Sequence, residues 1–187
     1  MNQYNTPTHF TRHCAVALLA LSMAAVGAHA EGSKADYDAA KSSAKQARRM
    51  AEAQCKSLSG NAADVCKAKA KVDYVAAEAG AEAKYKGTEK AVYDARVEVA
   101  KAKYELAKEV CDDHTGNDKS VCRKDAESSY VAAKADAEAS LKTHKAAYEA
   151  SETKSDAAYD AEKQRCDSLN GDAKDACVAR VKSTYGR

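Results

Sequence analysis

Three short segments of the chain begin and end with cysteine, and they restrict the possible folds more than any other feature. Each has ten residues between its cysteines, with a glycine followed by Asn or Asp near the middle. Glycine adopts the left-handed conformation that ends a helix without a steric clash. The Asx side chain can then accept N–H bonds at the start of the next helix. The pattern predicts three helix–turn–helix hairpins, with Gly60 and Asn61, Gly116 and Asn117, and Gly171 and Asp172 as their turn and cap residues.

The cysteines of each segment are predicted to pair with each other. On a continuous helix, residues at this separation lie about 16 Å apart, whereas a disulfide needs a Cα–Cα distance of about 4.4 to 6.8 Å. A reversal at the glycine brings them together. A zinc site is the competing interpretation, but the chain has no CxxC motif and few histidines. The predicted disulfides are Cys55–Cys66, Cys111–Cys122 and Cys166–Cys177.

Residues 1–30 have the features of a secretory signal peptide. A polar start is followed by an apolar run from Cys14 to Val26 and by an A-x-A cleavage site that ends at Ala30. The run is shorter than the roughly 20 residues that a membrane-spanning helix needs. Cleavage after Ala30 removes Cys14 and leaves an even number of cysteines, as a disulfide framework requires. We therefore expect a periplasmic protein with residues 31–187 as one domain and no transmembrane segment in the mature chain.

The composition predicts an all-α protein with a small core. The chain has no Trp, one Phe and one Pro, and its abundant Ala, Lys, Glu and Asp favour helices throughout. Alignment on the cysteines gives a repeat of about 55 residues in nearly three copies, approximately 33–87, 88–142 and 143–187. Tyrosines recur at corresponding positions, and we expect their rings to pack at the core edge with the hydroxyl in water.

Two arrangements of the helices fit this sequence. Residues 118–169 contain no Gly or Pro, so they can form one long helix. If residues 62–114 behave likewise, the protein is an elongated antiparallel bundle of coiled-coil character, four helices thick at one end and two at the other. The alternative breaks the helix at each repeat junction, Gly87 and Thr143, and stacks three compact hairpins. We favour the elongated form because the junction at Thr143 lacks a helix breaker. The additional residue at the first junction, Gly87, indicates a bend, a bulge or a turn there.

The sequence offers little support for catalysis or for nucleic-acid binding. Lys and Arg number 30 against 28 Asp and Glu, with the two signs interspersed, so no unscreened basic surface is expected. No phosphate-binding loop, nucleophile motif or metalloprotease motif occurs. His114 follows Asp112 and Asp113 in a turn, where a solvated loop is a better interpretation than a metal site. We therefore expect no enzymatic activity, no cofactor, no metal and no small-molecule substrate.

The cysteine segments resemble a known group of proteins. The pattern C-x-x-L-x-G-N/D-x4-C, followed by an Ala/Lys/Glu-rich helix, is similar to that of small exported proteobacterial proteins often labelled TolA-like. The residues that match are Cys55, Leu58, Gly60, Asn61 and Cys66, and again Cys166, Leu169, Gly171, Asp172 and Cys177. The resemblance implies a helical, periplasmic and envelope-associated protein, and it assigns no functional residues.

Three functions remain open at this stage. The first is a non-enzymatic scaffold or interaction module of the cell envelope, with protein partners or self-association. The second is a stress protectant or holdase whose amphipathic helices cover client proteins. The third, which has the least support, is periplasmic metal handling through cysteine and His114, and it would require free thiols.

Overall fold

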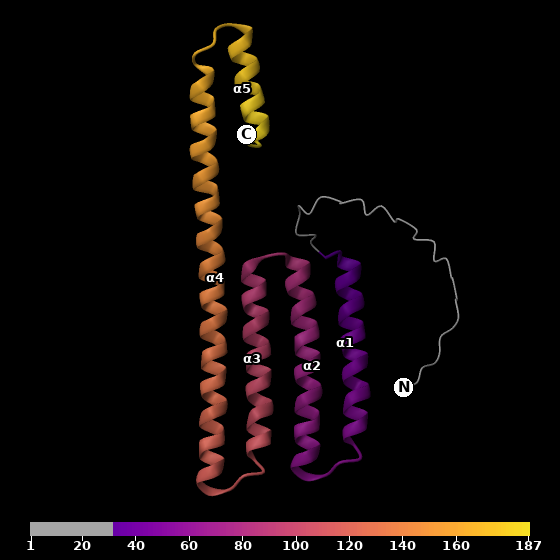
Figure 1. The fold of residues 1–187 in the computed structure, drawn as a ribbon. Helices are drawn as coiled ribbons and strands as arrows, with labels where there is room; N and C mark the ends of the chain where they lie inside the picture. Colours follow the sequence, from indigo (N-terminus) through magenta and orange to yellow (C-terminus); the bar gives the residue numbers. More distant parts are fainter. Residues whose placement is uncertain (1–31) are drawn as a thin grey trace, which may run out of the picture.

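The structure, a computed structural model, describes residues 32–187 as α-helices joined by short turns (Figure 1). The helices are α1 (Lys34–Cys55), α2 (Gly60–Lys86), α3 (Glu89–Cys111), α4 (Gly116–Cys166) and α5 (Asp172–Thr184). No strand occurs in this part of the chain, so the all-α prediction is confirmed. The predicted signal peptide and its cleavage site after Ala30 lie outside the described residues.

The helices form a row that is one helix thick. Between residues 32 and 187, each helix contacts only its neighbours in sequence, so that α1 packs on α2, α2 on α3, α3 on α4, and α4 on α5. Figure 1 shows α1, α2, α3 and the first half of α4 side by side, with α5 folded back on the far end of α4. The molecule is therefore elongated, as predicted, with α1 to α4 at one end and α4 with α5 at the other.

The two repeat junctions differ from each other. Residues 62–114 do not form one helix, so that part of the favoured arrangement is wrong. Gly87 has φ 60° and donates its N–H to Ala83 O, which ends α2, and the Thr88 side chain accepts from Ala91 N to begin α3. Glycine makes this reversal possible because a positive φ is strained for other residues. At Thr143 the helix continues, as predicted, and α4 spans 51 residues.

The three cysteine hairpins have nearly the same turn. Gly60, Gly116 and Gly171 have φ values of 55°, 54° and 56°, so the predicted positive-φ glycines are present. Each preceding helix, however, ends at its cysteine, several residues earlier than the glycine. The capping roles predicted for Asn61, Asn117 and Asp172 are wrong, because the N-cap residues are Ser59, Thr115 and Gly171, and none of these three helices has a side-chain cap hydrogen bond. Asn61 already lies inside the first turn of α2, and its Nδ2 donates to Glu109 O of α3 at 2.9 Å.

Alanine dominates the interior. Within the described residues, the buried apolar side chains are Ala44, Cys55, Ala63, Ala70, Val72, Ala79, Ala91, Ala100, Ala102, Cys111, Ala126, Ala137, Cys166 and Val181. Small side chains let neighbouring helices approach closely, but each one buries little apolar surface. The first cysteine of every hairpin is among these buried residues, so the disulfides belong to the core.

Candidate binding surface

The three predicted disulfides are all present, each closing one hairpin. The Cα–Cα distances are 5.6 Å for Cys55–Cys66, 5.6 Å for Cys111–Cys122 and 5.8 Å for Cys166–Cys177. The disulfide component of the sequence prediction is therefore confirmed. The first two hairpins lie together at one end of the row, and the third lies alone at the far end of α4 (Figure 1).

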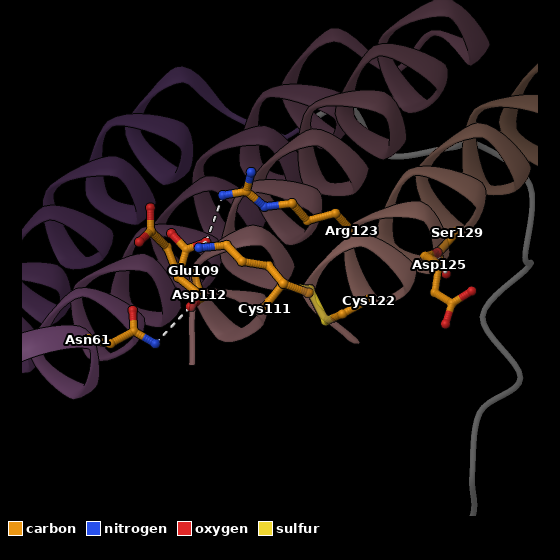
Figure 2. Close-up of a disulfide and its surroundings, with 9 residues drawn as sticks. Asn61, Glu109, Cys111, Asp112, Cys122, Arg123, Asp125 and Ser129 are labelled. Atoms are coloured by element: carbon orange, nitrogen blue, oxygen red, sulfur yellow. Dashed lines mark hydrogen bonds and ion pairs between the residues drawn. A yellow bond between two sulfur atoms is a disulfide. The ribbon is translucent and has the colours of Figure 1, made fainter. Parts of the chain in front are cut away.

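Polar contacts hold the second hairpin and join it to the first (Figure 2). Asp112 Oδ1 accepts from Arg123 Nη2 at 2.7 Å and lies 3.1 Å from Lys119 Nζ. Hydrogen bonds from Lys119 and Arg123 hold the pKa of the Asp112 carboxyl below its ordinary value. The bond from Asn61 to Glu109 O connects the start of α2 with the end of α3. These contacts join the ends of α2, α3 and α4 at the four-helix end of the row.

A pair of contacting side chains, one from each helix, recurs in all three hairpins. The Arg48 guanidinium lies 5.2 Å from the Tyr74 ring centroid, Tyr104 stacks on Tyr130 at 5.4 Å, and Tyr159 meets Tyr185 edge-on at 5.8 Å. The first member stands seven residues before the first cysteine, and the second stands eight residues after the second cysteine. Sequence reasoning noted the second member but missed the pair, although the constant spacing could have revealed it.

The tyrosine hydroxyls are not all left to solvent. Tyr185 Oη lies 3.0 Å from Glu162 Oε1, and burial together with this hydrogen bond raises the pKa of Tyr185. A hydrogen bond with Glu152 likewise raises the pKa of Tyr148. Tyr185 therefore packs with a local polar partner, whereas Tyr148 is exposed and bonds only within its own helix.

An apolar hollow that crosses three helices lies on one face of the row. It is a groove of about 430 Å³ with α3 as its floor and α2 and α4 as its walls. Its lining residues are Ala76 and Gly80 of α2, Ala95, Arg96, Val99, Ala100 and Lys103 of α3, and Ala133, Asp136 and Ala137 of α4. We call this set the groove. Apolar small residues with a few charged groups at the rim are typical of a surface that accepts another helix.

The α3 helix has two different exposed sides. Val99 lines the groove, and Val92 and Leu106 lie seven residues before and after it, so helical geometry places all three on the same side. Lys101 and Lys108 project from the opposite side. An apolar stripe that includes Val99 therefore runs along this side of α3, and lysines lie on the opposite side.

Two cations at the groove lack acidic partners within residues 32–187. Arg96 Nη1 donates to the neutral Ser140 Oγ at 2.8 Å, and neither Arg96 nor Lys103 forms an ion pair with another described residue. Most of the ion pairs elsewhere join residues three or four apart on one helix, as in Lys34–Asp38. The groove therefore presents two positive charges beside an apolar floor, together with the negative charge of Asp136 on its α4 wall.

Gly80 is the unusual residue of the groove. It lies in the interior of α2, where glycine costs about 0.8 to 1 kcal/mol relative to alanine. A Cβ added at Gly80 would have no heavy atom within 4 Å, so packing inside the molecule does not explain the glycine. The absence of a side chain leaves the groove wall open at this point.

The remaining sequence candidates do not form a site. His114 lies in the turn of the second hairpin, where its N–H donates to Cys111 O at 3.1 Å. Between residues 32 and 187, no group of three or more His, Cys, Asp or Glu side chains could hold a metal ion. Over the same residues, no helix has the length and hydropathy to span a membrane.

Comparisons with known proteins give no match that describes this surface. No family model, no curated protein and no solved structure matches the chain. Functional interpretation therefore rests on the sequence and on the geometry described above.

Proposed function

We propose that the protein is a non-enzymatic scaffold of the cell envelope that binds a helix of a partner protein in the groove. The observation that carries this proposal is the alanine-lined groove across α2, α3 and α4, with Arg96 and Lys103 available beside its floor. The three disulfides are compatible with an exported protein. Together with the predicted signal peptide, they support a location in the periplasm.

The groove dimensions favour a helix over an extended peptide. The open groove runs across three antiparallel helices and has small residues on both walls, which is the geometry that accepts the apolar face of an amphipathic helix. The rim charges favour a partner helix with carboxylates beside its apolar face. Because Arg96 and Lys103 are seven residues apart, they can meet two carboxylates with the same spacing on that helix.

Site-specific photo-cross-linking in living cells tests this proposal. A photoreactive amino acid in place of Val99, on the groove floor, is expected to capture a discrete partner, whereas the same group in place of Lys101, on the opposite side of α3, is not. Gly80→Leu fills the groove and is expected to abolish the adduct while the helicity is retained. Gln46→Leu, an exposed position on α1 outside the groove, is the matched control.

The possible outcomes distinguish the scaffold function from the protectant or holdase function. Equal capture from Val99 and Lys101, or an adduct that persists in Gly80→Leu, contradicts a groove-specific partner. Suppression of client aggregation by the purified protein, unchanged by Gly80→Leu, favours the protectant or holdase function instead.

A further inference from the structure

Among residues 32–187, one edge of α4 has no neighbour along its whole length. In Figure 1, α3 and α5 pack on the same side of α4, and the opposite side is free from end to end. Ala137 is buried in the row, and Ala135 lies on the other side of the helix because two residues correspond to a rotation of about 200°. The small residues of this free edge are Val131, Ala135, Ala146, Ala150 and Ala157, and all are exposed. Val131 is 59% exposed, which is unusual for a valine on a packed helix.

The same residue types form the α2·α3 interface inside the molecule. Ala79 of α2 and Ala91 and Ala95 of α3 line one hollow between these two helices. Further along the same interface, Val75 of α2 and Ala102 of α3 line another hollow. Ala79, Ala91 and Ala102 are buried in this antiparallel contact.

Alignment on the cysteines places both halves of that interface on the free edge of α4. The α2 residues Val75 and Ala79 correspond to Val131 and Ala135, and the α3 residues Ala91, Ala95 and Ala102 correspond to Ala146, Ala150 and Ala157. The α2 half and the α3 half meet because the chain reverses at Gly87. At Thr143 the helix is continuous, so the two halves lie end to end and cannot meet within one chain.

We propose that a second copy of this chain occupies this edge, with the two α4 helices antiparallel. The first half of α4 in each copy then packs on the second half of α4 in its partner and reproduces the α2·α3 contact twice. Since Ala135 faces Ala150 of the other copy, and Val131 faces its Ala157, the two-fold axis passes close to Thr143. The interface is isologous and closed, which limits the assembly to a dimer.

The opposite edge of the row shows why the pairing selects α4. On the outer side of α1, Ala91 and Ala95 correspond to Ala35 and Ala39, but the buried Ala102 corresponds to Gln46. The larger polar side chain there prevents a close helix–helix approach. The α4 edge departs from the α2 pattern at Ser128, which replaces Val72, so its apolar contact is smaller than the internal one. This inference is independent of the groove, which lies on a face of the row and stays open in the dimer.

Sedimentation equilibrium of the oxidised mature protein tests the proposal. The expected result is a dimer mass that falls to the monomer mass on dilution. Ala150→Glu places a charge in the interface twice per dimer and is expected to weaken association at least about tenfold. Ala39→Glu, an exposed position on the outer edge of α1, is the matched control and leaves the dimer intact. Far-UV circular dichroism is expected to be the same for both variants, because neither side chain is buried in the monomer.

Spin-label distances test the orientation and the position of the axis. Labels at Lys142→Cys lie beside the two-fold axis and are expected to give a short, well-defined distance between copies. Labels at Met50→Cys, which is 68% exposed on α1, give a long distance. A monomer at all concentrations overturns the proposal. So does a dimer that persists in Ala150→Glu, or one in which the Lys142→Cys labels are far apart.

Discussion

The row of helices and the arm beyond it are built from similar sequences but pack differently. We define the arm as residues 143–187, the second half of α4 with α5. In the row, the reversal at Gly87 places α3 between α2 and α4, so that two helices are packed on both sides. In the arm, residues 143–158 of α4 are all exposed. The comparison teaches that the residue at a repeat junction decides whether the next hairpin joins the row or extends from it.

A glycine inserted between Lys142 and Thr143 is expected to convert the arm into part of the row. The insertion gives Lys-Gly-Thr, the sequence found at Lys86, Gly87 and Thr88, and supplies a residue that adopts a positive φ at low cost. The third hairpin then folds back on the free edge of α4. Because α4 is otherwise about 75 Å long, the radius of gyration from small-angle X-ray scattering should fall clearly. An alanine insertion at the same place continues the helix and serves as the control. An unchanged radius with the glycine would show that the junction residue does not control the fold.

Removing single disulfides should affect the arm more than the row. Each bridge closes a loop of the same sequence separation, 11 residues, and a loop of this size contributes about 3 kcal/mol in the chain-entropy model. Without Cys166–Cys177, α5 has 13 residues and contacts only α4, so it is too short to persist by itself. Hydrogen exchange of Cys166→Ser/Cys177→Ser is expected to show complete loss of amide protection in α5.

The matched variant for this experiment is Cys55→Ser/Cys66→Ser. It loses an equivalent bridge, but α2 also packs on α3 and is braced by the bond from Asn61 to Glu109. Protection in α2 should therefore decrease without disappearing. Equal loss of protection in α2 and α5 would contradict the distinction between the row and the arm.

The smallest expected difference concerns two turn carboxylates. Asp112, in the row, is held by Lys119 and Arg123, whereas Asp167, in the arm, has Lys174 at 2.8 Å. Hydrogen bonds from these cations lower the pKa of both groups. A lowered pKa in the folded state stabilises the fold above the unfolded pKa of about 3.9, and this stabilisation is lost as the pH falls through the folded pKa.

Thermal melting of Asp112→Asn and Asp167→Asn checks this pH dependence. Each substitution should lower the Tm at pH 7 by only about 1 to 2 °C, because exposed ion pairs contribute little. Asp112→Asn should have the larger effect because Asp112 has two cationic neighbours. Both differences from the unmodified protein should diminish as the pH falls through the lowered pKa of each carboxyl. A difference that persists in acid would mean that the carboxylates act through hydrogen bonding in the turn and not through charge.

Much of the fold could be predicted from local sequence rules. The pairing of the six cysteines follows from the glycine between them, and the continuous helix at Thr143 follows from the absence of a breaker. The sharp turn at Gly87 was one of three possibilities, because a single glycine within a helical sequence is compatible with a bend, a bulge or a reversal. The reversal requires Thr88 to cap α3 as well, and this capping contact depends on a single side chain.

The candidate binding surface was harder to predict. Val92, Val99 and Leu106 form a heptad stripe that is visible in the sequence, but it is not the stripe that packs α3 on its neighbours. Only the arrangement of helices in a row shows that these residues remain on an open face. Gly80 was likewise indistinguishable from an ordinary helix-weakening residue until the space around it was known.

The unsupported middle of α4 has a mechanical consequence. In a single chain, a pulling force applied between the two ends passes through α4 alone between His144, which lies 3.6 Å from Glu89, and Asp156, which pairs with Arg187. Over this interval the load is carried by the backbone hydrogen bonds of one helix in water, while both ends are locked by covalent sulfur bridges. Under tension the protein should therefore yield first at its centre, lengthening there while its two ends remain folded.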